Sequence, residues 1–276
     1  MIKIYNEDCL VTMNFTLNPQ SVDLVITSPP YNNSRTSHTE YSLRTQNCRY
    51  AEYDDNKTNE EYCDWICDIF CGYDRILKKN GVVLFNISYG SENANVFFEC
   101  AYNIIKRTNF MVADIITWKK KSALPNNVSS NKLTRICEYV LVCCRKDEFD
   151  TYIANKEVKS IVERTQQPFY SALYNFVEAD NNDGATNDLN NATFSTEFVS
   201  KLLDMYAPKE NENTTIYDSF MGTGTTAMAC KFKGYNCYGS EISKKQCEYA
   251  ENRLMFNNKQ TTVVKSTDVE RFAWDI

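Results

Sequence analysis

Short apolar runs alternate along the chain with longer segments of helical periodicity. Seven runs have the length and β-branched content of buried strands, at residues 1–5, 22–27, 82–88, 111–118, 137–144, 214–219 and 235–241. Apolar positions recur at helical spacing over residues 59–77, 94–107, 196–206, 225–233 and 243–256. The first of these helices would start after an N-cap at Thr58 and stop at Asn80-Gly81. Strands that alternate with helices predict an α/β protein with a mostly parallel sheet covered on both faces.

Two polar stretches interrupt this alternation. Residues 32–56 show little periodicity, and residues 147–191 contain turn sequences such as Asn181-Asn182-Asp183-Gly184. Loops of that length in a compact domain usually serve a function. We therefore expect one α/β domain formed by residues 1–146 and 192–276, with an insert at residues 147–191.

The composition sets limits on location. A chain of 276 residues, of which 43% are hydrophobic, can form a full core. Its mean hydropathy is −0.49, and no apolar run approaches the roughly 18 residues that a membrane span needs. Residues 1–8 contain no long apolar segment of the kind found in signal peptides. We expect a cytoplasmic protein without membrane contact.

The charge distribution bears on possible partners. A net charge of −6 counts against non-specific binding to nucleic acid, because that affinity comes from neutralised phosphates. The cations are clustered, however, and their distribution matters more than the total. One segment contains Lys119, Lys120, Lys121, Lys132 and Arg135, and a second group starts at Arg35. From charge alone, a solvated surface and a DNA-binding surface explain these clusters equally well.

The cysteines indicate buried thiols rather than disulfides or a metal site. The chain has 12 cysteines and one histidine, His38, and no two cysteines have CxxC spacing. Cys63, Cys67 and Cys71 recur at helical spacing, and Cys143-Cys144 lies in an apolar run, where a reduced cysteine acts as a small hydrophobic residue. A zinc cage of cysteine and histidine is not expected.

The segment 214–226 has the sequence of a nucleoside-binding turn. An apolar strand ends at Asp218, a Gly-x-Gly turn follows at Gly222 and Gly224, and a helix begins after it. Gly222 permits the tight turn, and Gly224 lets the backbone approach a ligand closely. Glu241 ends the next strand, where a carboxylate can accept hydrogen bonds from two ribose hydroxyls. A nicotinamide-dependent oxidoreductase would carry the same unit.

The position of this unit in the chain predicts where the rest of the sheet originates. One helix and a tail follow Glu241 in the sequence, so the N-terminal strands must continue the sheet. Ligands bind outside the carboxyl ends of parallel strands. We therefore expect Asp8 and residues 27–31 to lie in the same cleft as Gly222 and Glu241.

A rigid loop with polar and aromatic groups follows the strand at residues 22–27. Its sequence is Ser28-Pro29-Pro30-Tyr31. The prolines fix two φ angles and remove two backbone donors, so the carbonyls remain as acceptors. Ser28 adds a hydroxyl and Tyr31 a flat ring. This set suits a planar base with an exocyclic amine; a plain strand-terminating turn is the structural alternative.

Two motifs resemble those of a known family. Thr27-Ser28-Pro29-Pro30-Tyr31 resembles the catalytic motif of the amino-group DNA methyltransferases, which modify N6 of adenine or N4 of cytosine. Residues 218–226 resemble that family's S-adenosylmethionine motif, in which a proline usually stands at the position of Ser219. The catalytic motif comes first in the chain, as in the β class of the family. The resemblance covers residues 1–145 and 186–256.

The resemblance implies a fold, a cofactor and a substrate. The fold would be Rossmann-like, with a seven-stranded, mostly parallel sheet and a circularly permuted motif order. The cofactor would be S-adenosylmethionine and the partner DNA, in the setting of restriction–modification, with no metal. Residues 6–9 resemble the segment that holds the cofactor's adenosine, and residues 118–139 resemble a Trp-x-Lys…Pro…Glu-Tyr block. Residues 192–197 stand where the family often has His-Pro…Phe-Pro, but the histidine and second proline are absent.

Roles for individual residues follow from the resemblance and the charge clusters. The residues implied for catalysis are Ser28, Pro29, Pro30 and Tyr31. Those implied for cofactor binding are Asp8, Cys9, Thr27, Phe194, Asp218, Phe220, Gly222, Gly224, Thr225, Thr226 and Glu241. Those expected to contact DNA are Arg35, Lys119, Lys120, Lys121, Lys132 and Arg135.

The two motifs also divide the domain into parts. Residues 1–146 would be the catalytic part, 147–191 a short target-recognition insert and 192–276 the cofactor-binding part. The insert is short for a self-sufficient reader of the major groove. A homodimer or a separate specificity subunit would compensate.

The expected reaction is direct methyl transfer to the amino group of a flipped base. In the family, serine before Pro-Pro-Tyr is associated with N4-cytosine and aspartate with N6-adenine. Ser28 therefore favours N4 of cytosine, with N6 of adenine as the alternative. A carbon-5 cytosine methyltransferase needs a cysteine after a proline, and this sequence has no such pair.

Three further classes of protein share parts of this sequence pattern. A protein-glutamine methyltransferase also uses an x-Pro-Pro-Tyr loop, but its cofactor motif comes first. A nicotinamide oxidoreductase leaves the Pro-Pro-Tyr loop unexplained. A catalytically inactive DNA-binding module would be expected to lose one of the two motifs.

Overall fold

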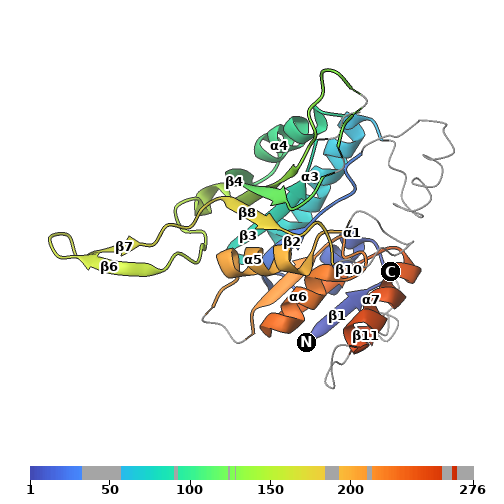
Figure 1. The fold of residues 1–276 in the computed structure, drawn as a ribbon. Helices are drawn as coiled ribbons and strands as arrows, with labels where there is room; N and C mark the ends of the chain where they lie inside the picture. The colour runs from blue at the N-terminus through green and yellow to red at the C-terminus, as the bar shows by residue number, and fades with distance from the viewer. Residues whose placement is uncertain are drawn as a thin grey trace.

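The computed structural model describes residues 1–32, 57–89, 93–123, 125–127, 129–183, 193–209, 213–256 and 263–265. Within these ranges, nine strands form one sheet with helices on both faces, and a two-stranded hairpin projects from it (Figure 1). The order across the sheet is β11-β1-β10-β9-β2-β3-β5-β4-β8.

The elements of the described ranges are as follows. The strands of the sheet are β1 (Ile2–Tyr5), β2 (Val22–Thr27), β3 (Leu77–Ile87), β4 (Phe110–Lys120), β5 (Cys137–Arg145), β8 (Phe176–Ala179), β9 (Thr215–Asp218), β10 (Asn236–Ser240) and β11 (Val263–Lys265). The hairpin consists of β6 (Val158–Val162) and β7 (Gln167–Tyr170). The helices are α1 (Cys9–Val11), the π-helical turn η1 (Thr12–Thr16), α3 (Asn59–Ile76), α4 (Val96–Arg107), the 3-10 turn η2 (Lys146–Glu148), α5 (Thr196–Tyr206), α6 (Thr225–Lys233) and α7 (Lys244–Phe256).

The predicted α/β fold with a mostly parallel sheet is confirmed, but the strand count of seven is too low. All seven expected strands are present, and only β5 runs antiparallel to its neighbours β3 and β4. The two additional strands, β8 and β11, are short edge strands that pair in parallel with β4 and β1. Strands of three or four residues at a sheet edge carry too few apolar positions to produce a periodic signal.

The sheet separates two hydrophobic cores because successive side chains of a strand point to opposite faces. Along β2, Leu24 and Ile26 enter the core beneath α5, α6 and α7, whereas Val25 enters the core beneath α3 and α4. All three side chains are at most 1% exposed. Strands buried on both faces explain why the sequence shows continuous apolar runs rather than alternation.

Helix α3 begins as predicted but ends earlier. Thr58 is the N-cap, and Glu61 completes a capping box with it. The expected stop at Asn80-Gly81 is wrong, because the helix ends at Ile76 and β3 starts at the next residue. Asn80 instead has a φ of 62° inside β3, where the pairing of β2 with β3 shifts register. The turn-like dipeptide therefore marks a strand irregularity.

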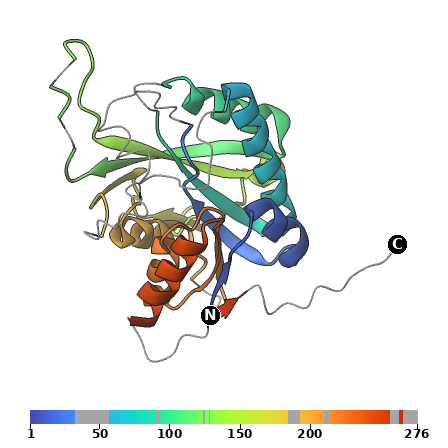
Figure 2. The same cartoon turned by 90° about the vertical axis from the view of Figure 1, so that its right-hand side faces the viewer.

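The N-terminal strand lies among C-terminal ones, as the motif order predicted. Strand β1 pairs in parallel with β10 on one side and β11 on the other, and Figure 2 shows the N-terminus beside this end of the sheet. The terminal amino group of Met1 donates to Asn236 Oδ1 at 2.7 Å. Strand β2 pairs with β9, which brings the predicted catalytic and cofactor motifs onto neighbouring strands.

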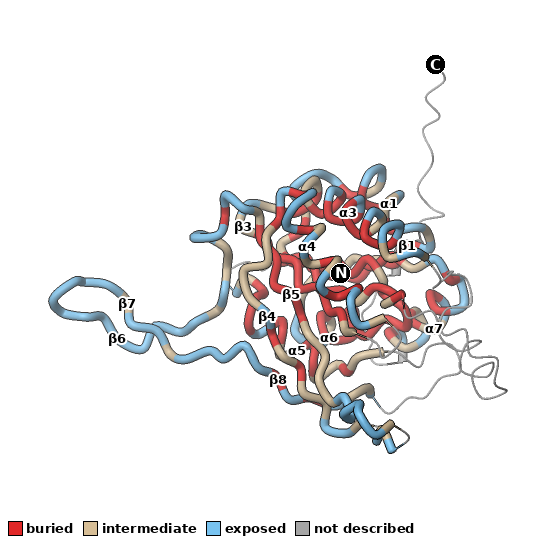
Figure 3. Tube along the Cα trace, turned by 90° about the horizontal axis from the view of Figure 1, so that it is seen from above, coloured by how far each residue is buried: buried red, intermediate tan, exposed pale blue. Residues whose placement is uncertain are grey.

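The segment 147–191 is only partly an insert. Its hairpin β6–β7 projects from the sheet and is exposed along most of its length (Figures 1 and 3). Strand β8, from the same segment, belongs to the main sheet through its pairing with β4.

The described cysteines are mostly buried thiols, as predicted. Nine of the eleven are buried and all eleven are free. The prediction is wrong for Cys71, which lies at an exposed position of α3. Among the helices that the structure describes, none has the length and apolarity needed to cross a membrane.

Candidate active site

The carboxyl ends of four parallel strands, β1, β10, β9 and β2, converge on one cavity of about 280 Å³. Both sequence motifs contribute to its wall. The predicted site residues that line it are Asp8, Cys9, Ser28, Pro30, Tyr31, Phe194, Phe220, Gly222, Thr225 and Glu241. The structure therefore brings the expected catalytic loop and the expected nucleoside site together.

Five predicted site residues, Thr27, Pro29, Asp218, Gly224 and Thr226, lie outside this wall. Asp218 accepts hydrogen bonds from Thr27 Oγ at 2.8 Å, Thr226 Oγ at 2.5 Å and the Phe220 amide at 3.1 Å. The carboxylate thus ties the end of β2 to the start of α6. These contacts make Asp218, Thr27 and Thr226 positioning residues behind the cavity.

Burial acts strongly on Asp218. The residue is 1% exposed, and desolvation raises the pKa of its carboxyl group to about 6, against the opposing effect of hydrogen bonds from Thr226 and Thr27. Its charge is therefore sensitive to pH close to neutrality.

The two glycines of the turn have different roles. Gly222 lines the cavity and has a φ of 54°. Gly224 has a φ of 82°, and a Cβ there would lie 2.9 Å from Cβ of Ala250 on α7. The sequence interpretation gave Gly224 close approach to the ligand. The structure shows that Gly224 adopts a left-handed conformation and allows α7 to pack closely, while its approach to the ligand stays a prediction.

Glu241, the residue after β10, is a carboxylate of the kind that can accept hydrogen bonds from hydroxyl groups. Glu241 Oε2 accepts from the Gly222 amide at 2.9 Å, and Oε1 accepts from the Ser243 amide at 2.8 Å. These two bonds fix the carboxylate at the cavity wall, and each oxygen can accept again. Two aromatic rings, Trp65 and Phe220, also line the cavity and pack with centroids 5.4 Å apart. An acidic group beside aromatic walls fits the adenosine part of S-adenosylmethionine.

A compact polar cluster surrounds the catalytic loop. The hydroxyls of Ser28 and Tyr31 lie 2.9 Å apart. Tyr31 Oη also donates to Glu138 Oε2 at 3.1 Å and accepts from Asn86 Nδ2 at 2.7 Å. Lys120 donates to the other oxygen of Glu138. The Tyr31 hydroxyl is therefore held in place by side chains from β3 and β5.

Sequence reasoning missed Asn86 and Glu138 as site residues. Asn86 lies near the carboxyl end of β3, after the apolar run at residues 82–85, and Glu138 lies near the amino end of β5, before the apolar run at residues 139–144. Asn86 is 2% exposed, and its Oδ1 accepts no hydrogen bond from the residues that the structure describes. A polar residue interrupting a buried run was the signal available in the sequence, since burial of an amide requires partners.

Ser219 replaces the proline usual in the resembled motif, and the structure gives it contacts that proline cannot make. Its hydroxyl lies 3.0 Å from Thr27 Oγ and 2.5 Å from the hydroxyl of Tyr73. Tyr73 is fully buried on α3 and needs a partner for its hydroxyl. The substitution is therefore accommodated by a buried hydrogen-bond network.

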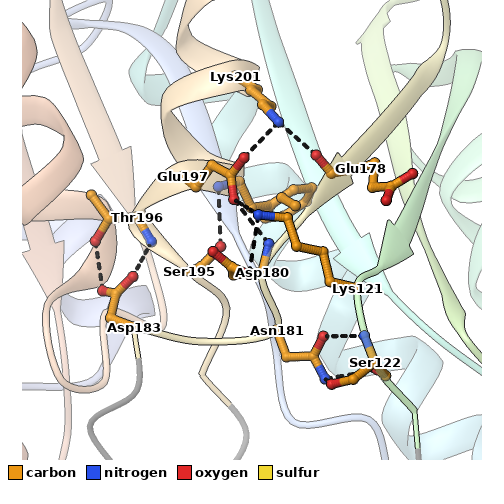
Figure 4. A network of polar contacts seen from close by, with 12 residues as sticks. Lys121, Ser122, Glu178, Asp180, Asn181, Asp183, Ser195, Thr196, Glu197 and Lys201 are labelled. Atoms are coloured by element: carbon orange, nitrogen blue, oxygen red, sulfur yellow. Dashed lines mark hydrogen bonds and ion pairs between the residues drawn. The ribbon is translucent and has the colours of Figure 1, made fainter.

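The lysines expected at DNA are engaged in ion pairs. Lys119 pairs with Glu178 at 2.9 Å, and Lys121 with Asp180 and Glu197, each at 3.1 Å. Figure 4 shows Lys121 linking β4, β8 and α5. Hydrogen bonds from Lys201, the Asp180 amide and Lys121 lower the pKa of Glu197 to about 2. A phosphate would have to displace these carboxylates, so Lys119 and Lys121 remain predictions that the geometry disfavours.

The remaining expected DNA contacts differ in their surroundings. Lys132 is exposed, and no ion pair involves it among the described residues. Arg135 is also exposed; it donates to the Tyr89 carbonyl at 2.7 Å, and its guanidinium lies 4.6 Å from the centre of the Tyr89 ring. Arg35 lies outside the described residues. The described cysteine and acidic side chains include no group of three placed to hold a metal ion.

The fold and the cavity define a class of enzyme. A nucleoside site at the carboxyl edge of a mostly parallel sheet, facing a Ser-Pro-Pro-Tyr loop, is the arrangement of an S-adenosylmethionine-dependent methyltransferase. Residues 22–252 match the family profile described as DNA methylase, which covers the N6 and N4 methyltransferases. The chain belongs to this family: it is a β-class DNA amino-methyltransferase whose methyl donor is S-adenosylmethionine.

Curated relatives align along most of the chain. The type II methyltransferase M.HinfI of Haemophilus influenzae is 27% identical over 91% of this chain and 67% of its own length. The orphan methyltransferase M.BamHII of Bacillus amyloliquefaciens is 25% identical over 85% of this chain and 89% of its own.

Solved structures show the same fold at lower identity. The PvuII DNA methyltransferase, described as cytosine-N4-specific, superposes with a TM-score of 0.70 at 15% identity, over 94% of this chain and 88% of its own. The complex of M1.HpyAVI with S-adenosylmethionine gives a TM-score of 0.56 at 20% identity, and the superposition covers 92% of this chain and 98% of the M1.HpyAVI chain.

Proposed function

We propose that the chain methylates the N4 amino group of cytosine in DNA, with N6 of adenine as the second candidate. The observation that carries this proposal is the place of Ser28. Ser28 lines the cavity that Gly222 and Glu241 also line, which supports a place for this residue beside the methyl donor.

The hydroxyl of Ser28 suits the edge of the target base. Cytosine and adenine both present an exocyclic amine beside a ring nitrogen that accepts hydrogen bonds. A hydroxyl can donate to that nitrogen or accept from the amine, whereas a carboxylate at the same position could only accept. Because both bases present this edge, the hydroxyl suits either one, and the preference for cytosine rests on the association of serine with N4-cytosine in the family.

The protein's part in the reaction is mainly orientation. The Tyr31 ring stacks on the flipped base, and Ser28 with the Pro29 carbonyl accepts from the amino group, so that its lone pair faces the methyl donor. The loop is held by Tyr62, whose hydroxyl donates to the Pro30 carbonyl at 2.5 Å. S-adenosylmethionine supplies an electrophilic methyl group. Correct orientation can lower the barrier by roughly 7–11 kcal/mol, so no strong base is required.

The base is tested by identifying the product. DNA methylated by the purified enzyme is digested to nucleosides and analysed by mass spectrometry. N4-methylcytosine is expected, and Ser28→Ala should reduce its yield without loss of cofactor affinity. N6-methyladenine as the sole product would overturn the choice of base and leave the methyltransferase assignment intact.

Target recognition is assigned to the segment 147–191, and within it to the hairpin β6–β7. A two-stranded ribbon fits the major groove of DNA, and this ribbon projects from the body of the protein. Replacing residues 158–170 by a short Gly-Ser linker should abolish site-specific methylation and preserve cofactor binding. Unchanged site preference would overturn the assignment of the hairpin to target recognition.

The named relatives are type II and orphan methyltransferases, which supports a role in restriction–modification.

A further inference from the structure

The loop between β4 and β5 carries one large apolar side chain among polar neighbours. Residues 129–135 of this loop have the sequence Ser-Ser-Asn-Lys-Leu-Thr-Arg. Leu133 is 88% exposed, more than any other large apolar residue in the described ranges. A leucine stabilises a fold through the apolar surface that it buries. The side chain of Leu133 therefore contributes little to folding, and its place in the loop points to a contact outside the chain.

Asn126 holds both sequence neighbours of Leu133. Its backbone amide donates to Thr134 Oγ at 3.0 Å, and its side-chain amide donates to the Lys132 carbonyl at 3.2 Å. Its Oδ1 accepts from the Ser129 amide at 3.3 Å. These bonds order the chain on each side of the leucine, so its side chain is presented to solvent from a fixed backbone.

The loop stands at the catalytic edge of the sheet and projects from it (Figure 2). Strand β5 starts where β3 ends, because Tyr139 of β5 pairs with Ile87 of β3. Glu138, also on β5, accepts a hydrogen bond from Tyr31 of the catalytic loop. The segment 133–138 is short enough to keep its first residue within roughly 18 Å of Glu138. The exposed leucine therefore lies close to the loop that is expected to hold the target base.

Two cations flank Leu133 in the sequence. Lys132 directly precedes it and Arg135 follows shortly after, and both are exposed. Arg135 donates to the carbonyl of Tyr89, which follows β3, so this limb of the loop is tied to the catalytic edge. Cations of this kind contact phosphates, and leucine is one of the side chains that proteins insert as a wedge between base steps of DNA.

We propose that Leu133 enters the base stack of DNA in the space that the flipped base leaves, while Lys132 and Arg135 contact the adjacent phosphates. The inference rests on the proposed transfer to a flipped base. Extrusion of a base costs unstacking and unpairing energy, and an apolar side chain in the gap offsets part of it. Leu133 does not line the cavity. It is therefore a positioning residue that keeps the target base out of the duplex.

The surroundings of Leu133 favour DNA over a protein partner. A protein interface on this loop would need a contiguous apolar patch, whereas the neighbours of the leucine are hydroxyl, amide and cationic side chains. One apolar side chain between cations matches the alternation of stacked bases and phosphates in DNA.

The wedge is tested on two duplexes that contain the methylated site, located beforehand by modified-base sequencing of genomic DNA from cells that express the enzyme. In the first duplex the target base is paired, and in the second it faces an abasic position. Single-turnover methyl transfer to the paired duplex should fall roughly tenfold to a hundredfold in Leu133→Ala, the loss expected when the burial of one leucine is removed. On the second duplex, both rates should agree within about threefold, because no base pair has to be broken.

Further variants separate the wedge from general DNA binding. Leu133→Met keeps a flexible apolar side chain and should retain the wild-type rate. Leu133→Lys adds a cation, so it should bind DNA at least as tightly as the wild type and still be slow on the paired duplex. Asn126→Ala should share the defect of Leu133→Ala, because it releases the backbone around the leucine. Phe232→Ala is the matched control, since Phe232 is 62% exposed and lies on α6. Unchanged affinity for S-adenosylmethionine verifies that each variant is folded.

Three outcomes would overturn the proposal. The first is a Leu133→Ala rate on the paired duplex equal to that of the wild type. The second is an equal loss on both duplexes, which would assign the leucine to DNA binding rather than to base flipping. The third is wild-type activity of Leu133→Lys on the paired duplex, which would make the loop a phosphate contact alone. A wild-type enzyme that methylates no DNA would contradict the proposed function itself, and the wedge with it.

Discussion

Two carboxyl groups at neighbouring strand ends serve the cavity in different ways. Glu241 is fixed at the cavity wall by hydrogen bonds from the Gly222 and Ser243 amides. Asp218 is enclosed and receives hydrogen bonds from Thr27 of β2, Thr226 of α6 and the Phe220 amide. The two acids thus differ in burial: Glu241, which we propose binds the ligand, lies at the cavity wall, whereas Asp218, which positions the loop, is buried behind it.

Replacement of Glu241 should affect the cofactor first. Glu241→Ala removes a charged acceptor for two ribose hydroxyls, and hydrogen bonds to a charged group contribute about 1.5–3 kcal/mol. We expect the Kd for S-adenosylmethionine, measured by calorimetry, to rise roughly tenfold to a hundredfold. Glu248→Ala on α7 is the control, because Glu248 is exposed and contacts only Lys244 in the described structure. Equal affinity of both variants would contradict the ribose role.

Asp218 should make folding stability depend on pH. Its raised pKa of about 6 means that the folded state holds the proton more tightly than the unfolded chain. The stabilisation is complete below the unfolded pKa and is lost as the pH rises through about 6. Relative to Asp218→Asn, the wild-type free energy of unfolding should fall by about 2 kcal/mol between about pH 4.5 and 7.5. The free energies of unfolding are measured by urea titration. If those of the wild type and of Asp218→Asn change with pH in parallel, the prediction is refuted.

The ring and the hydroxyl of Tyr31 can be separated by mutation. Tyr31→Ala removes a stacking contact of about 1–3 kcal/mol and should reduce methyl transfer by roughly fivefold to a hundredfold. Tyr31→Phe keeps the ring and loses the bonds to Ser28, Asn86 and Glu138, so its loss should be smaller. Single-turnover rates measure both. If Tyr31→Ala lowers thermal stability and cofactor affinity to the same degree, the loop is structural.

Elements with a strong local signal were predictable, and elements that depend on distant partners were not. The bounds of α5 and α6 and of β2 agree with the sequence pattern, because capping residues and apolar periodicity act within a few residues. The hairpin β6–β7 was missed because its side chains are exposed and carry no burial pattern. Strands β8 and β11 exist through pairing with β4 and β1, which local sequence does not encode.

The basic segment between β4 and β5 offers a test at the level of the element. Lys132 is exposed without an ion pair among the described residues, whereas Lys119 is paired with Glu178. Each phosphate contact contributes about 0.9 to the slope of log K against log salt concentration. Lys132→Gln should flatten the slope by nearly 1, and Lys119→Gln should change it little. The reverse ranking would show that phosphate displaces Glu178.

At the scale of the whole molecule, the order of motifs predicted which parts of the chain meet. The short C-terminal remainder after Glu241 required N-terminal strands to continue the sheet, and β1 and β2 do so. The exchange of β4 and β5 in the strand order and the antiparallel direction of β5 were not foreseen, since no local pattern distinguishes them. Asn86 and Glu138 could be recognised as site residues only after the pairing of β3 with β5 was known, because that pairing brings them together.

Strands from the two ends of the chain alternate in the sheet, so the protein could be cut into two fragments that complement each other. Strand β2 pairs with β9, and β1 lies between β10 and β11, so each half carries strand edges that only the other half can cover. A cut between Arg164 and Thr165, in the exposed turn of the hairpin, would leave two fragments that are inactive alone and prone to aggregation. Expressed together, residues 1–164 and 165–276 should rebuild the sheet and methylate DNA. The enzyme would then work as a split reporter, in which methylation of DNA indicates that the two fragments have assembled.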